Sequence, residues 1–228
     1  MDRKWIGIGV CLAFAAFVFY GVGWGVGSSS GDEEFKKSLD AMKQVKSFRG
    51  VFTATGSGMH SERLWEVDCS RMILHQQSQN QGGGDSGFDM KDDELLVGDV
   101  RYIREGDGGW QNTGYAGDRS SAKWHCDRVA QGIDSDLLPD MLTMIRHAIS
   151  EKGDKKTMNG VQCRVWKFAQ RTALAGQGGS ICIGVDDHLP YELTMDGGRY
   201  TYSDYNRPIE FEAPEAVLQQ ASAVSGSN

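Results

Sequence analysis

The feature that most constrains the fold is a series of four alternating apolar and polar segments in the C-terminal half of the chain. They read "NGVQCRVWKF", "GGSICIGV", "LPYELTM" and "RYTYSDY". Strict alternation is typical of β-strands with one buried face, and short turns between consecutive strands pair them antiparallel. The sequence therefore predicts an antiparallel meander of four strands in this half of the chain.

Two adjacent aspartates and a histidine, Asp186, Asp187 and His188, fall inside this meander, in the stretch "CIGVDDHLPYELTM". One interpretation is a metal or acid–base site, and the other is a turn between two strands. Aspartate is favoured in turns because its side chain binds nearby backbone N–H groups. Pro190 is also acceptable at the start of the next strand. We therefore interpret the three residues as a turn.

Two segments have the apolar spacing of helices. In "DEEFKKSLDAMKQVKSF" the apolar residues recur every three or four positions, which predicts an amphipathic helix of about fifteen residues beginning near Asp32. In "DSDLLPDMLTMIRHAISEKG" one stripe predicts a second helix that ends before Gly153. The members of that stripe are Leu138, Met141, Leu142, Ile145 and Ile149.

The segments between the two expected helices have the period of strands. "SFRGVFTATGSG", "HSERLWEVDC" and "RMILHQQSQ" predict three strands, because aromatic and β-branched residues alternate with polar ones. "DELLVGDVRYIREGDGGWQNT" predicts two short strands, a glycine-rich turn and a further strand starting at Trp110. Residues 113–125 give no clear expectation.

The N-terminal segment is apolar and predicts export. Trp5 to Gly31 contains no charged residue, and residues 5–27 have the length of about 20 residues that a spanning helix needs. Arg3 and Lys4 precede the segment, so the N-terminus is expected in the cytoplasm and the remainder outside, at the extracytoplasmic face of the membrane. A signal peptide cleaved near Gly27 is the alternative. The expected organisation is a signal anchor or signal peptide over 1–27, a linker over 28–31, one domain over 32–215 and a disordered tail over 216–228.

Four cysteines lie in the expected exported part: Cys69, Cys126, Cys163 and Cys182. An even number in an oxidising compartment favours disulfides. We favour a Cys163–Cys182 bond because both residues fall in strands expected to be neighbours, which leaves Cys69 with Cys126. The alternative is a zinc site with His125 and His188 as added ligands, but the spacing fits no CxxC or HxxxH pattern.

Charge and missing motifs narrow the function. The net charge of −7, with scattered lysines and arginines, argues against a nucleic-acid partner. The sequence has no GxSxG, GxxxxGK[ST], HExxH or GxGxxG motif in the required setting. We therefore expect a protein that is not an enzyme and that needs neither a cofactor nor a metal.

The order of helix, strands, second helix and closing meander resembles a known superfamily. The resemblance rests on "SLDAMKQVKSFRGVFTATG", "LLVGDVRYIREGDGGW" and "NGVQCRVWKF" followed by "CIGVDDHLPYELTM" and "YTYSDYNRPIEFEAP". These segments are similar to the periplasmic lipoprotein carriers, which include LolA- and LolB-type carriers, LppX/LprG-type lipoproteins and RseB-type regulators. The resemblance implies an α+β fold, a strongly curved, incomplete antiparallel β-barrel with two helices on its concave face.

The resemblance also implies a function, the carriage of an acyl chain of a lipid or lipoprotein between the sheet and the helices. The apolar side chains expected to line that space are Phe52, Trp65, Met72, Trp110, Met141, Ile145 and Trp166. For each of them, an ordinary packed core position is favoured over contact with a ligand. The alternative function is a sensor or interaction domain of the same fold that binds an envelope protein partner.

Overall fold

The computed structural model describes residues 30–56, 58–82, 89–117, 120–131, 145, 149–168, 178–195, 197–213 and 216–217. The expected membrane segment, residues 5–27, and most of the expected second helix lie outside these ranges. None of the helices within them is long and apolar enough to cross a membrane.

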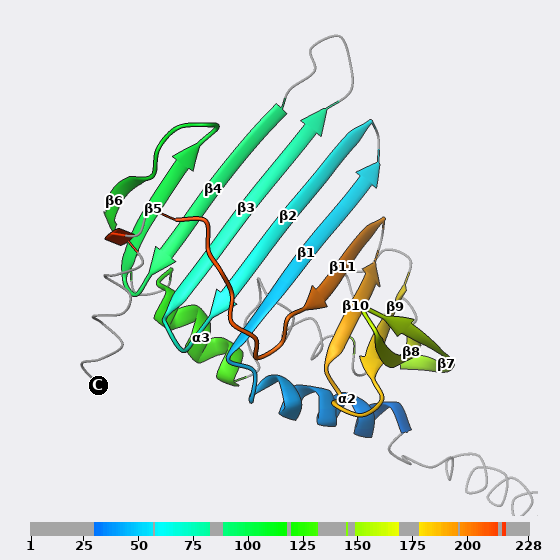
Figure 1. Ribbon diagram of the computed structural model, residues 1–228. Helices are drawn as coiled ribbons and strands as arrows, with labels where there is room; N and C mark the ends of the chain where they lie inside the picture. Colours follow the sequence, from blue (N-terminus) through cyan, green and yellow to red (C-terminus); the bar gives the residue numbers. More distant parts are fainter. Residues whose placement is uncertain are drawn as a thin grey trace, which may run out of the picture. The chain divides into compact units, whose positions relative to one another are not determined.

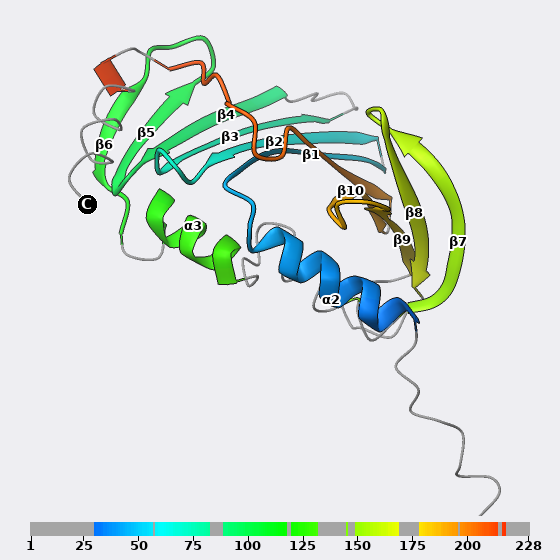
Figure 2. The same cartoon turned by 60° about the horizontal axis from the view of Figure 1, so that its bottom comes forward.

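Eleven antiparallel strands form one sheet in the described ranges, in the order β6-β5-β4-β3-β2-β1-β11-β10-β9-β8-β7 (Figure 1). Their bounds are β1 Ser47–Gly56, β2 Met59–Asp68, β3 Ile73–Gly82, β4 Asp89–Val97, β5 Val100–Glu105, β6 Gln111–Tyr115, β7 Ile149–Met158, β8 Val161–Phe168, β9 Gly179–Gly184, β10 Pro190–Met195 and β11 Gly198–Ser203. The sheet is strongly curved and does not close, since β6 and β7 are not paired with each other (Figure 2). The predicted meander is confirmed as β8 to β11.

Two helices, α2 (Ser30–Met42) and α3 (Ala122–Gln131), lie on the concave side of the sheet (Figure 2). Their apolar faces and the concave sheet face form one buried group, the inner cluster. It includes Phe35, Met42, Val67, Leu74, Leu96, Ala122, Val129 and Trp166. The predicted first helix is confirmed as α2, which begins at Ser30 because acidic residues in its first turn favour a start there.

The prediction that the second helix continues through Ile149 and ends just before Gly153 is wrong. Ile145 is helical and buried in the inner cluster, but Ile149 begins strand β7, and Gly153 lies within that strand. This strand, "ISEKGDKKTM", is at the edge of the sheet, where lysines are common because they prevent pairing with other chains. Its polar sequence therefore lacks the alternation that marks the central strands.

A tight turn at Asn159 and Gly160 joins β7 to β8. Both residues have positive φ, 50° and 80°, and Met158 is paired with Val161 across the turn. Two positive φ values are those of a type I′ turn, whose twist suits a two-residue hairpin and which favours Asn-Gly.

Replacing Gly160 with alanine should lower the free energy of unfolding by about 1–2 kcal/mol, because a Cβ is disfavoured at positive φ. Urea titration would measure the loss. Gly109→Ala is the matched control, since Gly109 has no positive φ and a Cβ there would meet no atom within 4 Å. Equal losses in the two variants would contradict the assignment of strain to the turn.

The convex face of the sheet is crossed by residues 207–213, which we call the C-terminal strap (Figure 1). The strap packs on a second buried group, the outer cluster, made of Ile73, Leu95, Val97, Tyr102, Ile209, Phe211 and Val217. Val217 falls in the tail that was expected to be disordered, and it is buried; residues 218–228 lie outside the described ranges. The sheet is therefore covered on both faces.

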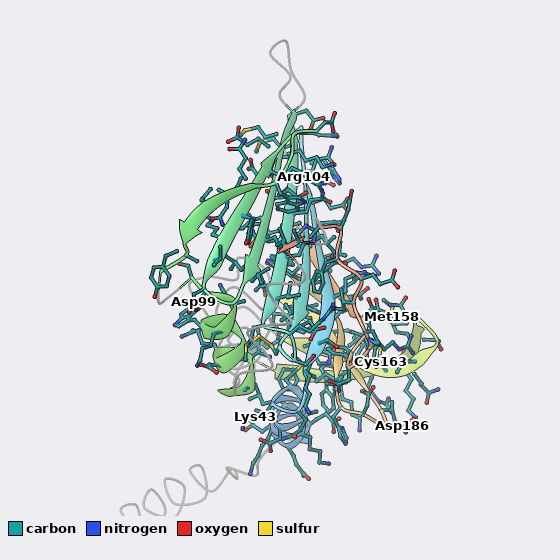
Figure 3. All side chains as sticks on the ribbon, turned by 60° about the vertical axis from the view of Figure 1, so that its left-hand side comes forward. Lys43, Asp99, Arg104, Met158, Cys163 and Asp186 are labelled. Atoms are coloured by element: carbon teal, nitrogen blue, oxygen red, sulfur yellow. A yellow bond between two sulfur atoms is a disulfide. The ribbon has the colours of Figure 1, made fainter. Side chains whose placement is uncertain are left out.

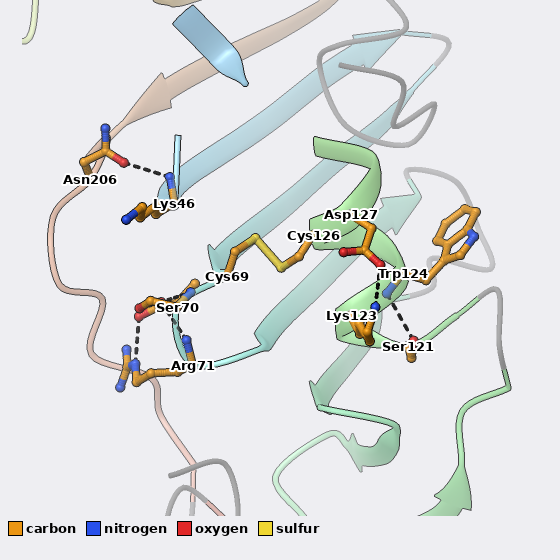
Figure 4. The surroundings of a disulfide bond; sticks show 11 residues. Lys46, Cys69, Ser70, Arg71, Ser121, Lys123, Trp124, Cys126, Asp127 and Asn206 are labelled. Atoms are coloured by element: carbon orange, nitrogen blue, oxygen red, sulfur yellow. Dashed lines mark hydrogen bonds and ion pairs between the residues drawn. A yellow bond between two sulfur atoms is a disulfide. The ribbon is translucent and has the colours of Figure 1, made fainter. Parts of the chain in front are cut away.

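Both expected disulfides are present. Cys163–Cys182 joins β8 to β9 with a Cα separation of 5.5 Å. Cys69–Cys126 joins the turn after β2 to α3 with a Cα separation of 5.4 Å (Figure 4). The zinc alternative is therefore not supported, because the four sulfur atoms are bonded in two pairs. The second disulfide holds α3 against the sheet.

Candidate functional site

A cavity of about 590 Å³ opens on the concave face of the sheet, beside α3. Its lining residues are Phe52, Arg63, Trp65, Leu74, Gln76, Glu94, Leu96, Arg101, Ala116, Ser120, His125 and Tyr200. Most of them come from β1 to β5 and β11, Ala116 and Ser120 come from the segment that leads into α3, and His125 lies in α3 itself. Alternation along each strand sends these side chains to one face of the sheet.

The floor of the cavity is apolar and aromatic. Phe52 of β1 is paired with Tyr200 of β11, and their ring centroids are 4.6 Å apart. Trp65 stacks at 6.3 Å on Tyr200. Leu74 and Leu96 are paired across β3 and β4 at the end of the cavity nearest α3.

The polarity of the cavity changes along the strands. Gln76 lies two residues after Leu74 in β3, on the side away from the helices. It is paired with Trp65 of β2 and with Glu94 of β4. Arg63 precedes Trp65 by two residues in β2, and so lies still farther from the helices. Glu94 binds Arg101 at 2.8 Å, and the Arg63 guanidinium lies 5.7 Å from the Trp65 ring centroid. The cavity therefore has an apolar end at α3 and a polar end toward the β1–β2 hairpin.

The convex face carries a row of charges across β1 to β5. Arg49 binds Glu66 at 2.9 Å, and Glu66 contacts His75 Nδ1 at 2.8 Å. His75 Nε2 contacts Asp93 at 2.5 Å, and Asp93 accepts a 2.8 Å hydrogen bond from Arg104. The side chains of Glu66, His75 and Asp93 are at most 7% exposed. We call these five residues the charge row.

His75 carries a proton on both ring nitrogens in this arrangement, because each nitrogen faces a carboxylate oxygen. Burial alone would lower the pKa of His75, but the hydrogen bonds to Glu66 and Asp93 outweigh it and raise the pKa above its ordinary value. Burial would raise the pKa of Glu66, but its bonds to His75 and Arg49 lower it. The charge row is therefore a network in which every charge faces an opposite one, and its three central members, Glu66, His75 and Asp93, are buried.

The strap and Trp110 cover the charge row. The Arg104 guanidinium lies 4.9 Å from the Trp110 ring centroid, and Trp110 meets the His75 ring edge-on at 6.0 Å. Arg104 also reaches Glu212 of the strap at 3.4 Å. Figure 3 shows Arg104 far from Asp186, so the row is remote from the polar group that the sequence made prominent.

The interpretation of residues 186–188 as a turn is confirmed. The Gly184 N–H donates to the Leu189 carbonyl at 2.8 Å, and the Asp187 carboxylate accepts from the Leu189 N–H at 3.1 Å. His188 has a positive φ of 57° and contacts Glu34 of α2 at 2.7 Å. The described residues contain no cluster of three or more side chains that could hold a metal ion. The turn thus joins two strands and fastens α2.

The side chains expected to line a ligand space are not all together. Phe52 and Trp65 lie in the cavity, whereas Met72, Ile145 and Trp166 pack in the inner cluster. Trp110 lies on the convex face with the outer cluster. Met141 lies outside the described residues. Whether these residues contact a ligand stays a prediction.

Sequence reasoning missed Leu74, Leu96 and Tyr200 on the floor of the cavity and the whole of α3 beside it. The strand alternation could have indicated the first three, since each shares a face with a predicted neighbour. For α3 a signal existed in Ala122, Cys126 and Val129, which recur at helical spacing. Ser121 caps that helix by accepting a hydrogen bond from the Trp124 N–H at 3.2 Å (Figure 4).

No family model matches the sequence, and no curated protein matches it. Among solved structures, LprF from Mycobacterium bovis matches with a TM-score of 0.54 at 11% identity, over 81% of this chain and 96% of that chain. The chain therefore has a fold similar to that of LprF. At this level of identity the half-barrel likeness concerns the fold alone.

Two further structures match more distantly. MucB in complex with MucA(peri) has a TM-score of 0.37 at 14% identity, over 81% of this chain and 58% of that chain. A DUF1329 family protein from Desulfovibrio piger has a TM-score of 0.29 at 7% identity, over 85% of this chain and 97% of that chain. Neither score is high enough to support an argument about the half-barrel described here.

Proposed function

We propose that the half-barrel binds the acyl chain of a lipid or lipoprotein in the concave-face cavity. The observation that carries this proposal is the apolar floor of Phe52, Trp65, Leu74, Leu96 and Tyr200 beneath a polar rim. An acyl chain on such a floor gains about 0.8 kcal/mol for each CH₂ group removed from water. The volume of about 590 Å³ also falls within the range of about 300–1,000 Å³ of small-molecule sites.

The proposal includes an extracytoplasmic location. The two disulfides support it, because such bonds persist in oxidising compartments. Residues 5–27 would then hold the domain at the membrane, as a fixed binding protein instead of a soluble shuttle. We also propose that the protein acts by binding and not by catalysis; near the cavity, Glu94 and Arg101 neutralise each other.

Replacing Ser120 with tryptophan should weaken acyl-chain binding at least about tenfold, because the indole would occupy space that several CH₂ groups otherwise fill, each contributing about 0.8 kcal/mol. Ser120 is exposed and lines the cavity, so the change should leave the core intact. The measurement is photocrosslinking of the full-length protein, purified from an oxidising host, to palmitate with a diazirine in its chain. Mass spectrometry of the peptides would separate cavity crosslinks from those in residues 5–27.

Thr113→Trp is the matched control, since Thr113 is exposed on the adjacent strand β6 and does not line the cavity. Binding should persist in this variant. Crosslinks confined to residues 5–27 in the unaltered protein would overturn the proposal and favour the protein-interaction alternative, in which a partner protein contacts the half-barrel.

A further inference from the structure

Arg63 differs from the other arginines of the described strands. Arg49, Arg101, Arg104 and Arg199 bind the carboxylates of Glu66, Glu94, Asp93 and Glu192, respectively, and Arg164 donates to the Gly153 carbonyl. For Arg63, the residues described in the structure supply neither a carboxylate nor a carbonyl partner. Within the described part of the chain, its N–H donors are therefore left for a bound group.

The side chains paired with Arg63 on the concave face are uncharged. Its pairing partners across the two neighbouring strands are Phe52 and Ser78, and Trp65 lies two residues along the same strand. Alternation places all four side chains on the same face. Because none of the three neighbours is charged, they do not neutralise the positive charge of Arg63 at the edge of the cavity.

Trp65 positions the guanidinium of Arg63. The Arg63 Cζ atom lies 5.7 Å from the Trp65 ring centroid, a cation–π distance. A guanidinium held over an aromatic face retains N–H donors at its edge, and these donors match the two oxygens of a carboxylate or phosphate. The donors lie at the polar end of the cavity, while Leu74 and Leu96 mark its apolar end.

We infer that the cavity selects amphiphiles whose headgroup is an oxyanion, bound by Arg63, with the acyl chain directed toward Leu74 and Leu96 below α3. This inference rests on the proposed acyl-chain binding and adds the charge and the orientation of the ligand. Palmitate and lysophosphatidate both have the required chemistry, since one ends in a carboxylate and the other in a phosphate. Monopalmitoylglycerol has a similar chain and an uncharged headgroup.

The test is competition of these three unlabelled amphiphiles against the diazirine palmitate probe on the full-length protein, with crosslinks counted only in the cavity peptides. The unaltered protein should bind palmitate or lysophosphatidate at least about tenfold more tightly than monopalmitoylglycerol, the effect of one charge-assisted hydrogen-bonding group. Palmitate and lysophosphatidate compared with each other identify whether carboxylate or phosphate is preferred.

Arg63→Gln should remove the preference for anions and leave monopalmitoylglycerol binding unchanged. Lys91→Gln is the matched control: it removes one positive charge from exposed Lys91, which alternation places on the convex face of β4, and should retain the preference. Equal binding of charged and uncharged amphiphiles by the unaltered protein would overturn the role of Arg63 while acyl-chain binding stands. Failure of all three amphiphiles to compete at the cavity would overturn the proposed function itself.

Discussion

Asp93→Asn is expected to lower the free energy of unfolding by about 3–5 kcal/mol, the usual effect of removing one member of a buried ion pair. Asp93 is 2% exposed and faces both His75 and Arg104, so the change removes a buried carboxylate from two cations and leaves them only Glu66 and Glu212, respectively. Urea titration would measure the loss. Asp92→Asn is the control, because Asp92 is exposed and next in sequence; equal losses would show that the charge row does not stabilise the fold.

The same network predicts a dependence of stability on pH. Because the pKa of His75 is raised above its ordinary 6.5, the stabilisation from its proton is complete below pH 6.5 and is lost as pH rises through the folded-state value. Because the pKa of Glu66 is lowered from 4.5, its contribution is present above pH 4.5 and is lost as pH falls through the folded-state value. For these two groups the free energy of unfolding is highest between those two ordinary values. In His75→Gln the decline above pH 6.5 should be absent, and a decline of unchanged slope would contradict the assignment.

Removing the Cys69–Cys126 disulfide is expected to cost about 4 kcal/mol, since in the chain-entropy model the loss grows with the 57-residue separation of the two cysteines. The 19-residue separation of Cys163 and Cys182 predicts a smaller loss of about 3 kcal/mol. Paired cysteine-to-serine variants, compared by thermal or urea unfolding, would measure both losses.

The two disulfide variants should also differ in ligand binding. Cys126 lies in α3, directly after the cavity residue His125. Loss of its bond releases α3 from the sheet, so cavity crosslinking by the palmitate probe should fall more in this variant than in the Cys163–Cys182 variant. The opposite ranking would show that α3 is held by its packing alone.

The sequence predicts well those parts of the fold in which the buried residues follow a regular pattern within one short segment. The meander β8 to β11 and the helix α2 each have an apolar period and turn residues within a few positions. Strand β7 was missed because an edge strand needs few apolar side chains, and its lysines resemble the end of a helix. The turn at residues 186–188 was predicted correctly because aspartate chemistry within the turn determines it.

The candidate site was harder to predict because it depends on distant segments. Glu66, His75 and Asp93 have the sequence pattern of a solvated strand face, but Trp110 and the strap, residues 207–213, cover the charge row and the three residues are buried. Trp110 was expected at the ligand and instead covers this row, because the glycine-rich turn before it brings β6 alongside β5 with the indole on the convex face. Arg63 gave no signal in the sequence, because it differs from the other strand arginines only in having no carboxylate or carbonyl partner among the described residues.

Strand β1, the first in the sequence, is paired with β11, the last in the sequence, with Arg49 opposite Ser203. The centre of the half-barrel therefore forms only after β11 has been synthesised. Until then the hydrogen-bonding edge of β1 remains open to any other extended chain. Contacts this distant in sequence also slow folding. The incomplete chain is therefore prone to aggregation until β11 pairs with β1. Truncated proteins that lack β11 should accumulate as insoluble material.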